Sequence, residues 1–350
     1  MKIAVVNVAA EVGGTVSLLL DFVKQLSILD SENEWYILTS VVKVKETENI
    51  HNFRFPQIKK SMMHRLFWEY RVFPQFIKKH KISVVLSMQN NGLPCRVQKQ
   101  IVYFHNILLI QQRYRFSLFN KSERRFALSR MIKNPYIRYS WKMADLIITQ
   151  TESVKEMLSE FYPKEQIMVI PPSLNLDIKE PSDKKVKGFI YPAGPGAYRN
   201  FEIIIDAVKG LEIEGKSVEI LFTISGEENT YAKEIKRRAD RTSGIRLIGR
   251  QSRESILQMY ESYGLIITSK LESFPFPILE AMHYQTVIVA LDFPYVQDQM
   301  RMTKYNRLYI AKRDGTDLRE MIMKALLDEE KGNFSIKNNS TMSILKLLCK

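Results

Sequence analysis

The residues best suited to chemistry lie in four loops, each of which follows a predicted strand. One loop carries two carboxylates, Glu272 and Glu280, eight positions apart. Carboxylates are strong acceptors for the hydroxyl groups of a sugar ring. Another loop ends in Arg199 and Asn200 at a predicted helix start, where a cation and the helix dipole together favour a bound anion. These two loops therefore predict a site for a ligand with hydroxyl and anionic groups.

The other two loops lie in the first half of the chain. Gly13 and Gly14 follow the first predicted strand, and glycines there let backbone amides approach a phosphate at the positive end of a helix. His105 ends a later apolar run, where an imidazole could transfer a proton. Each candidate also has a structural explanation, because glycines turn chains, exposed charged side chains are solvated, and single histidines often only support a fold.

The alternation of apolar runs with helical patterns predicts parallel sheets of the doubly wound α/β class. We expect the long helical pattern 122–142 to be kinked or broken before Pro135. The predicted strands are Lys2–Val8, Trp35–Thr39, Ser83–Leu86, Gln100–Phe104, Leu146–Thr149, Ile167–Ile170, Gly188–Ala193, Val218–Ser225, Ile245–Ile248, Leu265–Ser269 and Val287–Ala290. The predicted helices are Thr15–Leu29, Ser122–Lys142, Ser153–Phe161, Asn200–Lys209, Thr230–Arg241, Arg253–Glu261, Pro277–Tyr284 and Asp317–Asp328.

A stretch rich in proline, serine and charge, residues 171–185, interrupts this alternation and indicates a linker. We therefore expect a first Rossmann-like domain over 1–177, a linker over 178–187 and a second Rossmann-like domain over 188–330. Residues 331–350 form a tail that belongs clearly to neither domain and is able to pack back on the first. Ligands of open α/β sheets bind beyond the carboxyl ends of strands, so we expect the two domains to face a cleft.

The positive charge of the chain is local. The 350 residues have a formal net charge of +14, and two windows account for the excess. Residues 54–81 hold eight Lys and Arg against one Glu, and residues 99–142 hold ten against one. Both windows also carry aromatic side chains. This combination suits an anionic membrane surface, a polyanionic substrate or nucleic acid, and a solvated helix face is the remaining alternative.

Composition excludes several classes of protein. At 45% hydrophobic and 26% charged residues, the whole chain is not collagen, coiled coil or disordered. Cys95 and Cys349 are the only cysteines, which excludes a disulfide framework and multi-thiolate metal sites and favours a reducing compartment. No apolar run approaches the roughly 20 residues of a membrane span. The run Ile3–Ala10 contains Asn7 and continues into Glu11, which favours a buried strand over a signal peptide.

Taken together, these residues resemble glycosyltransferase family 4, the retaining sugar-nucleotide transferases of GT-B fold. Glu272-Ser-Phe and Leu-Glu280-Ala-Met are similar to the two ends of the family's E-x7-E motif. Arg199 and Asn200 stand where the family usually has Lys-Asn before a helix. Further similarity runs through Met143–Val154, Ile170–Pro172 and Asp292–Asp298.

The resemblance implies a hexosyltransferase that needs no metal and no cofactor. Its donor would be a nucleotide-sugar, and its acceptor a saccharide, in our interpretation lipid-linked and part of a cell-surface polysaccharide. We expect a cytoplasmic enzyme, and windows 54–81 and 99–142 would allow a peripheral position at the cytoplasmic face of the membrane. Nucleic acid is not expected as a partner.

The resemblance also implies a role for each candidate. Arg199 would neutralise the diphosphate leaving group, Glu272 would hold the hydroxyls of the donor sugar, and His105 would lie near the transferred sugar and acceptor. Glu280 would hold the ribose, and the glycines would meet the diphosphate. The donor-contacting residues implied in this way are Gly13, Gly14, Arg199, Asn200, Glu272, Ser273, Phe274 and Glu280.

Three departures from the family pattern keep alternatives open. Pro275 stands where the family often has glycine, and proline has no backbone N–H with which to contact a donor. The segment at Gly194 and Pro195 lacks a second arginine, and residues 285–287 replace the common Gly-x-Pro. The alternatives are a weak or inactive GT-B relative that acts as a binding or scaffold subunit and, less favoured, a basic nucleic-acid-binding protein.

Overall fold

The computed structural model describes residues 1–11, 14–112, 116–119, 124–172, 185–330, 332–336 and 340–349. The chain folds as two units, one formed by residues 1–114, 129–175 and 338–350 and the other by residues 115–128 and 176–337. The first expected domain therefore loses residues 115–128 to the second unit. The predicted tail is divided, since its last thirteen residues group with the first unit.

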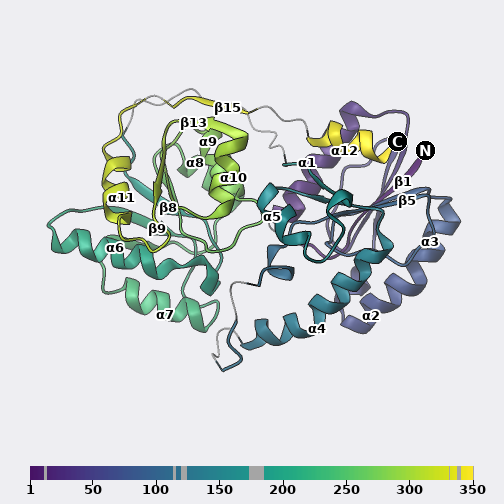
Figure 1. The fold of residues 1–350 in the computed structure, drawn as a ribbon, viewed down its shortest axis with the longest axis horizontal. Coiled ribbons are helices and arrows are strands. Elements are labelled where there is room, and N and C mark those ends of the chain that lie inside the picture. The colour runs from purple at the N-terminus through teal and green to yellow at the C-terminus, as the bar shows by residue number, and fades with distance from the viewer. Residues whose placement is uncertain are drawn as a thin grey trace. The chain divides into compact units, whose positions relative to one another are not determined.

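The first unit is built on a seven-stranded sheet in which every described strand pair is parallel (Figure 1). The strand order is β3-β2-β1-β4-β5-β6-β7. The strands are β1 (Lys2–Asn7), β2 (Glu34–Thr39), β3 (Ile50–Arg54), β4 (Val84–Ser87), β5 (Lys99–Tyr103), β6 (Leu146–Thr149) and β7 (Ile167–Val169). The helices are α1 (Gly14–Leu29), α2 (Met62–Phe67), α3 (Phe73–His80), α4 (Arg124–Ser140), α5 (Glu152–Leu158) and α12 (Ser340–Leu348), with a π-helical turn, Trp68–Val72, between α2 and α3.

Strand β1 lies inside this sheet, between β2 and β4, and is buried on both faces. Ile3 and Val5 pack in one apolar cluster, whereas Ala4 and Val6 pack in another, as the two-residue period of a strand requires. The first cluster includes side chains of α1 and of the C-terminal helix α12, which lie side by side in Figure 1. The end of the chain therefore completes the core of the first unit.

The second unit is built on a six-stranded parallel sheet of order β10-β9-β8-β11-β12-β14. A short antiparallel pair, β13 (Thr303–Tyr305) and β15 (Phe334–Ile336), accompanies it. The strands of the sheet are β8 (Gly188–Tyr191), β9 (Glu219–Phe222), β10 (Ile245–Leu247), β11 (Gly264–Ile267), β12 (Ile288–Leu291) and β14 (Leu308–Ala311). The helices are α6 (Phe201–Ile213), α7 (Thr230–Ala239), α8 (Arg253–Met259), α9 (Phe276–His283), α10 (Pro294–Met302) and α11 (Leu318–Leu326).

The predicted fold class, two doubly wound α/β domains, is confirmed. The sequence analysis missed strands β3, β13, β14 and β15 and the helices α2, α3, α10 and α12. Of the kink or break expected before Pro135, the break is wrong, because α4 continues through Pro135 as one helix. Most of the predicted linker, residues 178–184, lies outside the described residues.

Close packing in the first unit leads to a testable prediction at Gly92, in the loop after β4. A Cβ atom there would clash with the backbone carbonyl oxygen of Ser140, at the end of α4. Because neither backbone segment can move without disturbing the packing around it, we expect Gly92→Ala to destabilise the folded protein by about 2 kcal/mol or more. Gly194→Ala is the matched control, because its Cβ would meet nothing within 4 Å. Equal thermal midpoints for the two variants would contradict this packing.

Candidate functional site

The strand order of the second sheet reverses between two neighbouring strands, β8 and β11. From β8 the chain proceeds to β9 and β10 on one side, whereas from β11 it proceeds to β12 and β14 on the other. Open α/β sheets bind ligands at such a switch point, beyond the carboxyl ends of the strands. The loops that follow β8 and β11, residues 192–200 and 268–275, are therefore brought together at the predicted location.

Side-chain hydroxyls join these two loops. The Tyr191 hydroxyl donates to the carbonyl oxygen of Arg199 at 2.7 Å and lies 2.8 Å from Ser269 Oγ. The Thr268 hydroxyl lies within hydrogen-bond distance of the carbonyl oxygens of Arg199 and Asn200, at 3.2 and 3.1 Å. Tyr191, Thr268 and Ser269 are all buried. Because buried hydrogen bonds are costly to break, these contacts fix the backbone on which Arg199 stands.

Arg199 and Glu272, one from each loop, form an ion pair. The guanidinium also donates to Ser269 Oγ at 3.1 Å. Both side chains are mostly buried, with 22% of Arg199 and 16% of Glu272 exposed. The Nε atom of Arg199 has no hydrogen-bond partner among the described residues. The pair thus presents a fixed cation and a fixed carboxylate at the switch point, and the cation retains an unused donor.

Asn200 turns the chain into α6. Its φ of 59° is left-handed, a conformation that asparagine tolerates better than most residues. Its side chain makes no capping hydrogen bond, and the backbone N–H of Phe201 is instead bound to the Tyr231 hydroxyl at 3.3 Å. In this structure Asn200 therefore serves to shape the turn beside Arg199.

Glu280 lies within α9 and pairs with Arg253, the first residue of α8. The Arg253 Nε donates to Glu280 Oε1 at 2.8 Å, and the carboxylate is mostly buried. The nearby Tyr260 hydroxyl is buried. Its burial is the main reason that the pKa of Tyr260 lies well above its usual value, and the negative charge of Glu280 adds to the effect. Sequence reasoning missed Arg253, although its place at a helix start after a strand was a usable signal.

The segment between the two carboxylates carries the remaining predicted donor contacts. Ser273 is half-buried, whereas Phe274 is buried and packs edge-on against Phe276 with ring centroids 5.2 Å apart. Pro275 is the residue before α9. The sequence analysis expected this helix to begin at Pro277, but it begins at Phe276, so Pro277 is its second residue. Phe274 is therefore part of the packing that holds this loop.

The first sheet has its own switch point, between β1 and β4. Of the two predicted glycines after β1, Gly13 lies outside the described residues and Gly14 is the exposed first residue of α1. Gly14 is thus placed at a helix N-terminus, as the sequence analysis expected.

His105 follows β5 and is held by Asn90, which lies in the loop after β4. The His105 backbone N–H donates to Asn90 Oδ1 at 2.8 Å, and Asn90 Nδ2 lies 3.1 Å from His105 Nε2. Burial lowers the pKa of His105 to about 4, and a hydrogen bond with the Tyr103 backbone acts in the opposite direction. His105 is therefore neutral at physiological pH, which is a poor state from which to donate a proton.

A fully buried carboxylate, Glu69, supports the same loop from the π-helical turn. Tyr136 donates to Glu69 Oε2 at 2.6 Å, and Arg65 Nε donates to Oε1 at 2.9 Å. Asn91 Nδ2, in the loop after β4, lies at 3.5 Å from the same Oε1. The sequence analysis counted Glu69 only as the single acid in a basic window, because it missed the helices that bury this side chain.

Metal ligands are not grouped in the part of the chain that the structure describes. Nowhere in it do three or more His, Cys, Asp or Glu side chains come together in an arrangement that could hold a metal ion. None of the described helices is both long and apolar enough to cross a membrane.

A family model covers the unit that contains these carboxylates. Residues 175–342 match the glycosyl transferases group 1. The matched region contains Arg199, Glu272 and Glu280 and covers slightly less than half of the chain. The match supports the predicted resemblance at this level of classification.

Comparison with known proteins agrees with this assignment. The chain is 25% identical over 206 residues to a probable sucrose-phosphate synthase of Thermosipho melanesiensis, covering 53% of this chain and 45% of that relative. The chain thus spans less than half the length of this curated relative.

Solved glycosyltransferases share the fold over nearly the whole chain. The Anabaena HepE protein in complex with UDP and glucose superposes with a TM-score of 0.63 at 15% identity, over 94% of this chain and 90% of HepE. WaaG, a glycosyltransferase of lipopolysaccharide biosynthesis, gives a TM-score of 0.64 at 11% identity, over 93% and 90%. At these identities the likeness establishes the GT-B fold alone.

The burial of Glu280 leads to a second prediction. Arg253→Ala removes the cation beside a mostly buried carboxylate, so we expect a loss of about 1–3 kcal/mol in the free energy of unfolding. Arg246→Ala is the matched control, because Arg246 pairs with Glu219 at the same distance, 2.8 Å, but is 66% exposed. Its loss should be clearly smaller. Equal shifts in the thermal midpoint would contradict the larger contribution expected of the buried Arg253–Glu280 pair.

Proposed function

We propose that this protein is a retaining, metal-independent glycosyltransferase of the hexosyltransferase type. It transfers a sugar from a nucleotide-sugar donor to a saccharide acceptor. The observation that carries the proposal is the Arg199–Glu272 pair at the switch point of a sheet whose sequence matches group 1 glycosyltransferases. The complex of the similarly folded HepE with UDP and glucose supports a uridine nucleotide as the first donor to test.

Each charged group has one task in this proposal. Arg199 stabilises the negative charge that develops on the leaving diphosphate, which is the main requirement for a reaction without a metal. Glu272 accepts hydrogen bonds from the donor sugar, and Glu280 accepts them from the ribose. From the first unit, His105 contacts the transferred sugar as a neutral side chain. When donor binds, its phosphate and hydroxyl groups replace part of the Arg199–Glu272 contact.

A second candidate, a donor-binding subunit without turnover, has an observation in its favour. Pro275 stands directly before α9 and offers no N–H at this helix start. The missing amide would weaken stabilisation of the leaving group more than it would weaken binding. Nucleotide binding without transfer or donor hydrolysis would favour this candidate.

Substitution of the charged residues tests the enzymatic proposal. We expect Arg199→Ala and Glu280→Ala each to lower turnover by roughly tenfold or more, because each removes a charge from the donor site. Turnover is measured as transfer or donor hydrolysis with a panel of uridine, adenosine and guanosine diphosphate sugars. Arg237→Ala, an exposed residue of α7, is the control and should retain the wild-type rate. No activity with any donor, together with no calorimetric binding of a nucleoside diphosphate, would refute the proposal.

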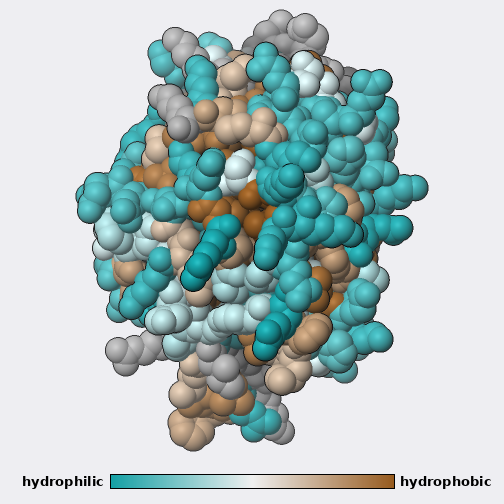
Figure 2. All heavy atoms as spheres, turned by 90° about the vertical axis from the view of Figure 1, so that its right-hand side faces the viewer, coloured by the Kyte–Doolittle hydropathy of each residue, from teal (hydrophilic) through white to brown (hydrophobic). Residues whose placement is uncertain are grey.

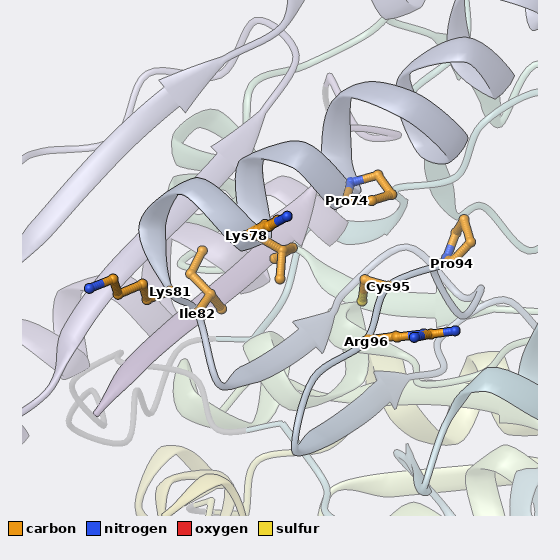
Figure 3. A pocket seen from close by; sticks show the side chains of 8 residues that line it. Pro74, Lys78, Lys81, Ile82, Pro94, Cys95 and Arg96 are labelled. Carbon is orange, nitrogen blue, oxygen red and sulfur yellow. The ribbon is translucent and has the colours of Figure 1, made fainter.

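We further propose that the acceptor is lipid-linked and that the first unit binds the cytoplasmic face of an anionic membrane. Figure 2 shows, on the face that carries α3, an apolar area bordered by hydrophilic side chains. A pocket of about 600 Å³ opens between α3 and the segment before β5, with an apolar lining and the cations Lys78, Lys81 and Arg96 (Figure 3). Basic side chains attract anionic lipid head groups, and apolar side chains add burial at the interface.

Exposed apolar side chains on the neighbouring helices α2 and α4 support binding of this face to a membrane. Met63 and Phe67 of α2 are 74% and 64% exposed, and Met131 of α4 is 65% exposed. WaaG, which has a similar fold, is a glycosyltransferase involved in lipopolysaccharide biosynthesis, and this supports a lipid-linked acceptor. The membrane proposal is independent of the donor proposal.

Charge reversal tests the membrane surface. We expect the wild-type protein to sediment with phosphatidylglycerol vesicles but not with phosphatidylcholine vesicles, because each basic residue near an anionic surface contributes about 1 kcal/mol. The double variant Lys78→Glu, Lys81→Glu should lose most of this binding. Lys43→Glu, Lys45→Glu changes the net charge of the same unit equally at exposed positions outside both windows. Equal losses in the two variants, or no binding by the wild type, would contradict the proposed surface.

A further inference from the structure

Both ends of one amide side chain hold His105. Asn90 has a left-handed φ of 70° and lies in the loop after β4, and His105 follows the adjacent strand, β5. The Asn90 Oδ1 accepts from the His105 backbone N–H at 2.8 Å. The Asn90 Nδ2 lies 3.1 Å from His105 Nε2. The amide thus spans from the backbone of His105 to its ring.

The chemistry of these groups fixes the location of the ring proton. The His105 backbone N–H is only a donor, so the amide atom facing it must be the oxygen. The nitrogen of Asn90 must therefore face the ring, and an amide NH₂ group only donates. His105 Nε2 is consequently the acceptor, which requires that it carry no proton and that the proton of the neutral ring lie on Nδ1.

The surroundings hold Asn90 in this orientation. Asn90 is buried, and its own carbonyl oxygen accepts from Trp141 Nε1 at 2.8 Å. On the next residue, Asn91, the carbonyl oxygen accepts from the Ser87 hydroxyl at 2.6 Å, and the amide approaches Glu69. Rotation of the Asn90 amide would place two donors against each other at the backbone of His105. The contacts of Trp141 and Asn91 therefore hold the backbone of this loop, and the His105 backbone N–H determines the orientation of the Asn90 amide.

We propose that Asn90 is a positioning residue that keeps His105 neutral, with its proton on Nδ1 and its Nε2 occupied. His105 then serves the site as a fixed, uncharged ring and not as a proton acceptor for the incoming hydroxyl. The proton location on His105 does not depend on the proposed function, whereas the role of His105 in sugar transfer rests on it. Among the described residues, burial is the dominant cause of the low His105 pKa, and no charged side chain contributes to it.

Nitrogen NMR tests the proton location without any activity. In protein labelled with ¹⁵N-histidine, the His105 signals are assigned from their loss in His105→Gln. We expect a neutral ring with a protonated Nδ1 and a hydrogen-bonded, unprotonated Nε2 from about pH 6 to 9. A proton on Nε2, or a cationic ring at neutral pH, would overturn the proposal. Because this readout uses resting wild-type protein, it decides the question even if no donor is found.

Asn90→Asp reverses the polarity of the contact while keeping an oxygen for the His105 backbone N–H. A carboxylate beside Nε2 stabilises the protonated ring, so we expect the His105 pKa to rise towards neutrality or above. Asn333→Asp, the same substitution at an exposed position, should leave the His105 signals unchanged. An unchanged His105 titration in Asn90→Asp would also overturn the proposal.

If transfer activity is found, the pH dependence of kcat/KM gives a second readout. In the wild type, kcat/KM should not change near pH 6.5, the ordinary pKa of histidine, because His105 remains neutral until the pH falls to about 4. In Asn90→Asp the raised pKa should make kcat/KM fall as the pH is lowered through the neutral range. A wild-type limb near pH 6.5 that is lost in His105→Gln would contradict a neutral role.

Discussion

The hydrogen bonds between the loops after β8 and β11 determine where the charges of the second unit stand. Tyr191 and Thr268 hold the carbonyl of Arg199, and Ser269 joins both the Tyr191 hydroxyl and the Arg199 guanidinium. These partners are buried, so the cost of leaving any of them unpaired opposes movement of the loop. The reversal of strand order between β8 and β11 then places the Arg199–Glu272 pair where a ligand can reach it.

The two units contribute different electrostatics. In the second unit, Arg199 and Glu272 supply full charges that are held in place before a ligand arrives, which lowers the cost of reorganisation during reaction. In the first unit, the histidine that had been considered for proton transfer is neutral and engaged by Asn90. For the proposed transfer reaction, these side chains therefore favour stabilisation of a leaving diphosphate over acid–base chemistry at His105.

The sequence predicted the two parallel sheets because central strands such as β1 are continuous apolar runs. It also selected Arg199, Glu272 and Glu280 as candidate site residues, since they follow strands and lie at or near helix starts, and the structure pairs Arg199 with Glu272. It missed β3 and β14, whose half-buried positions break the apolar pattern, and helices α2 and α3, where basic residues obscured the period. The partners Arg253 and Asn90 depend on contacts between distant segments, and nothing in the local sequence indicates which side chains will meet.

The central claim is that Arg199 and Glu272 hold the diphosphate and the sugar of a donor. A crystal structure of the protein with a bound nucleoside diphosphate sugar tests it most directly. The account predicts a phosphate oxygen within hydrogen-bond distance of the Arg199 guanidinium and a sugar hydroxyl on the Glu272 carboxylate. A donor bound elsewhere, with the Arg199–Glu272 pair undisturbed, would contradict it.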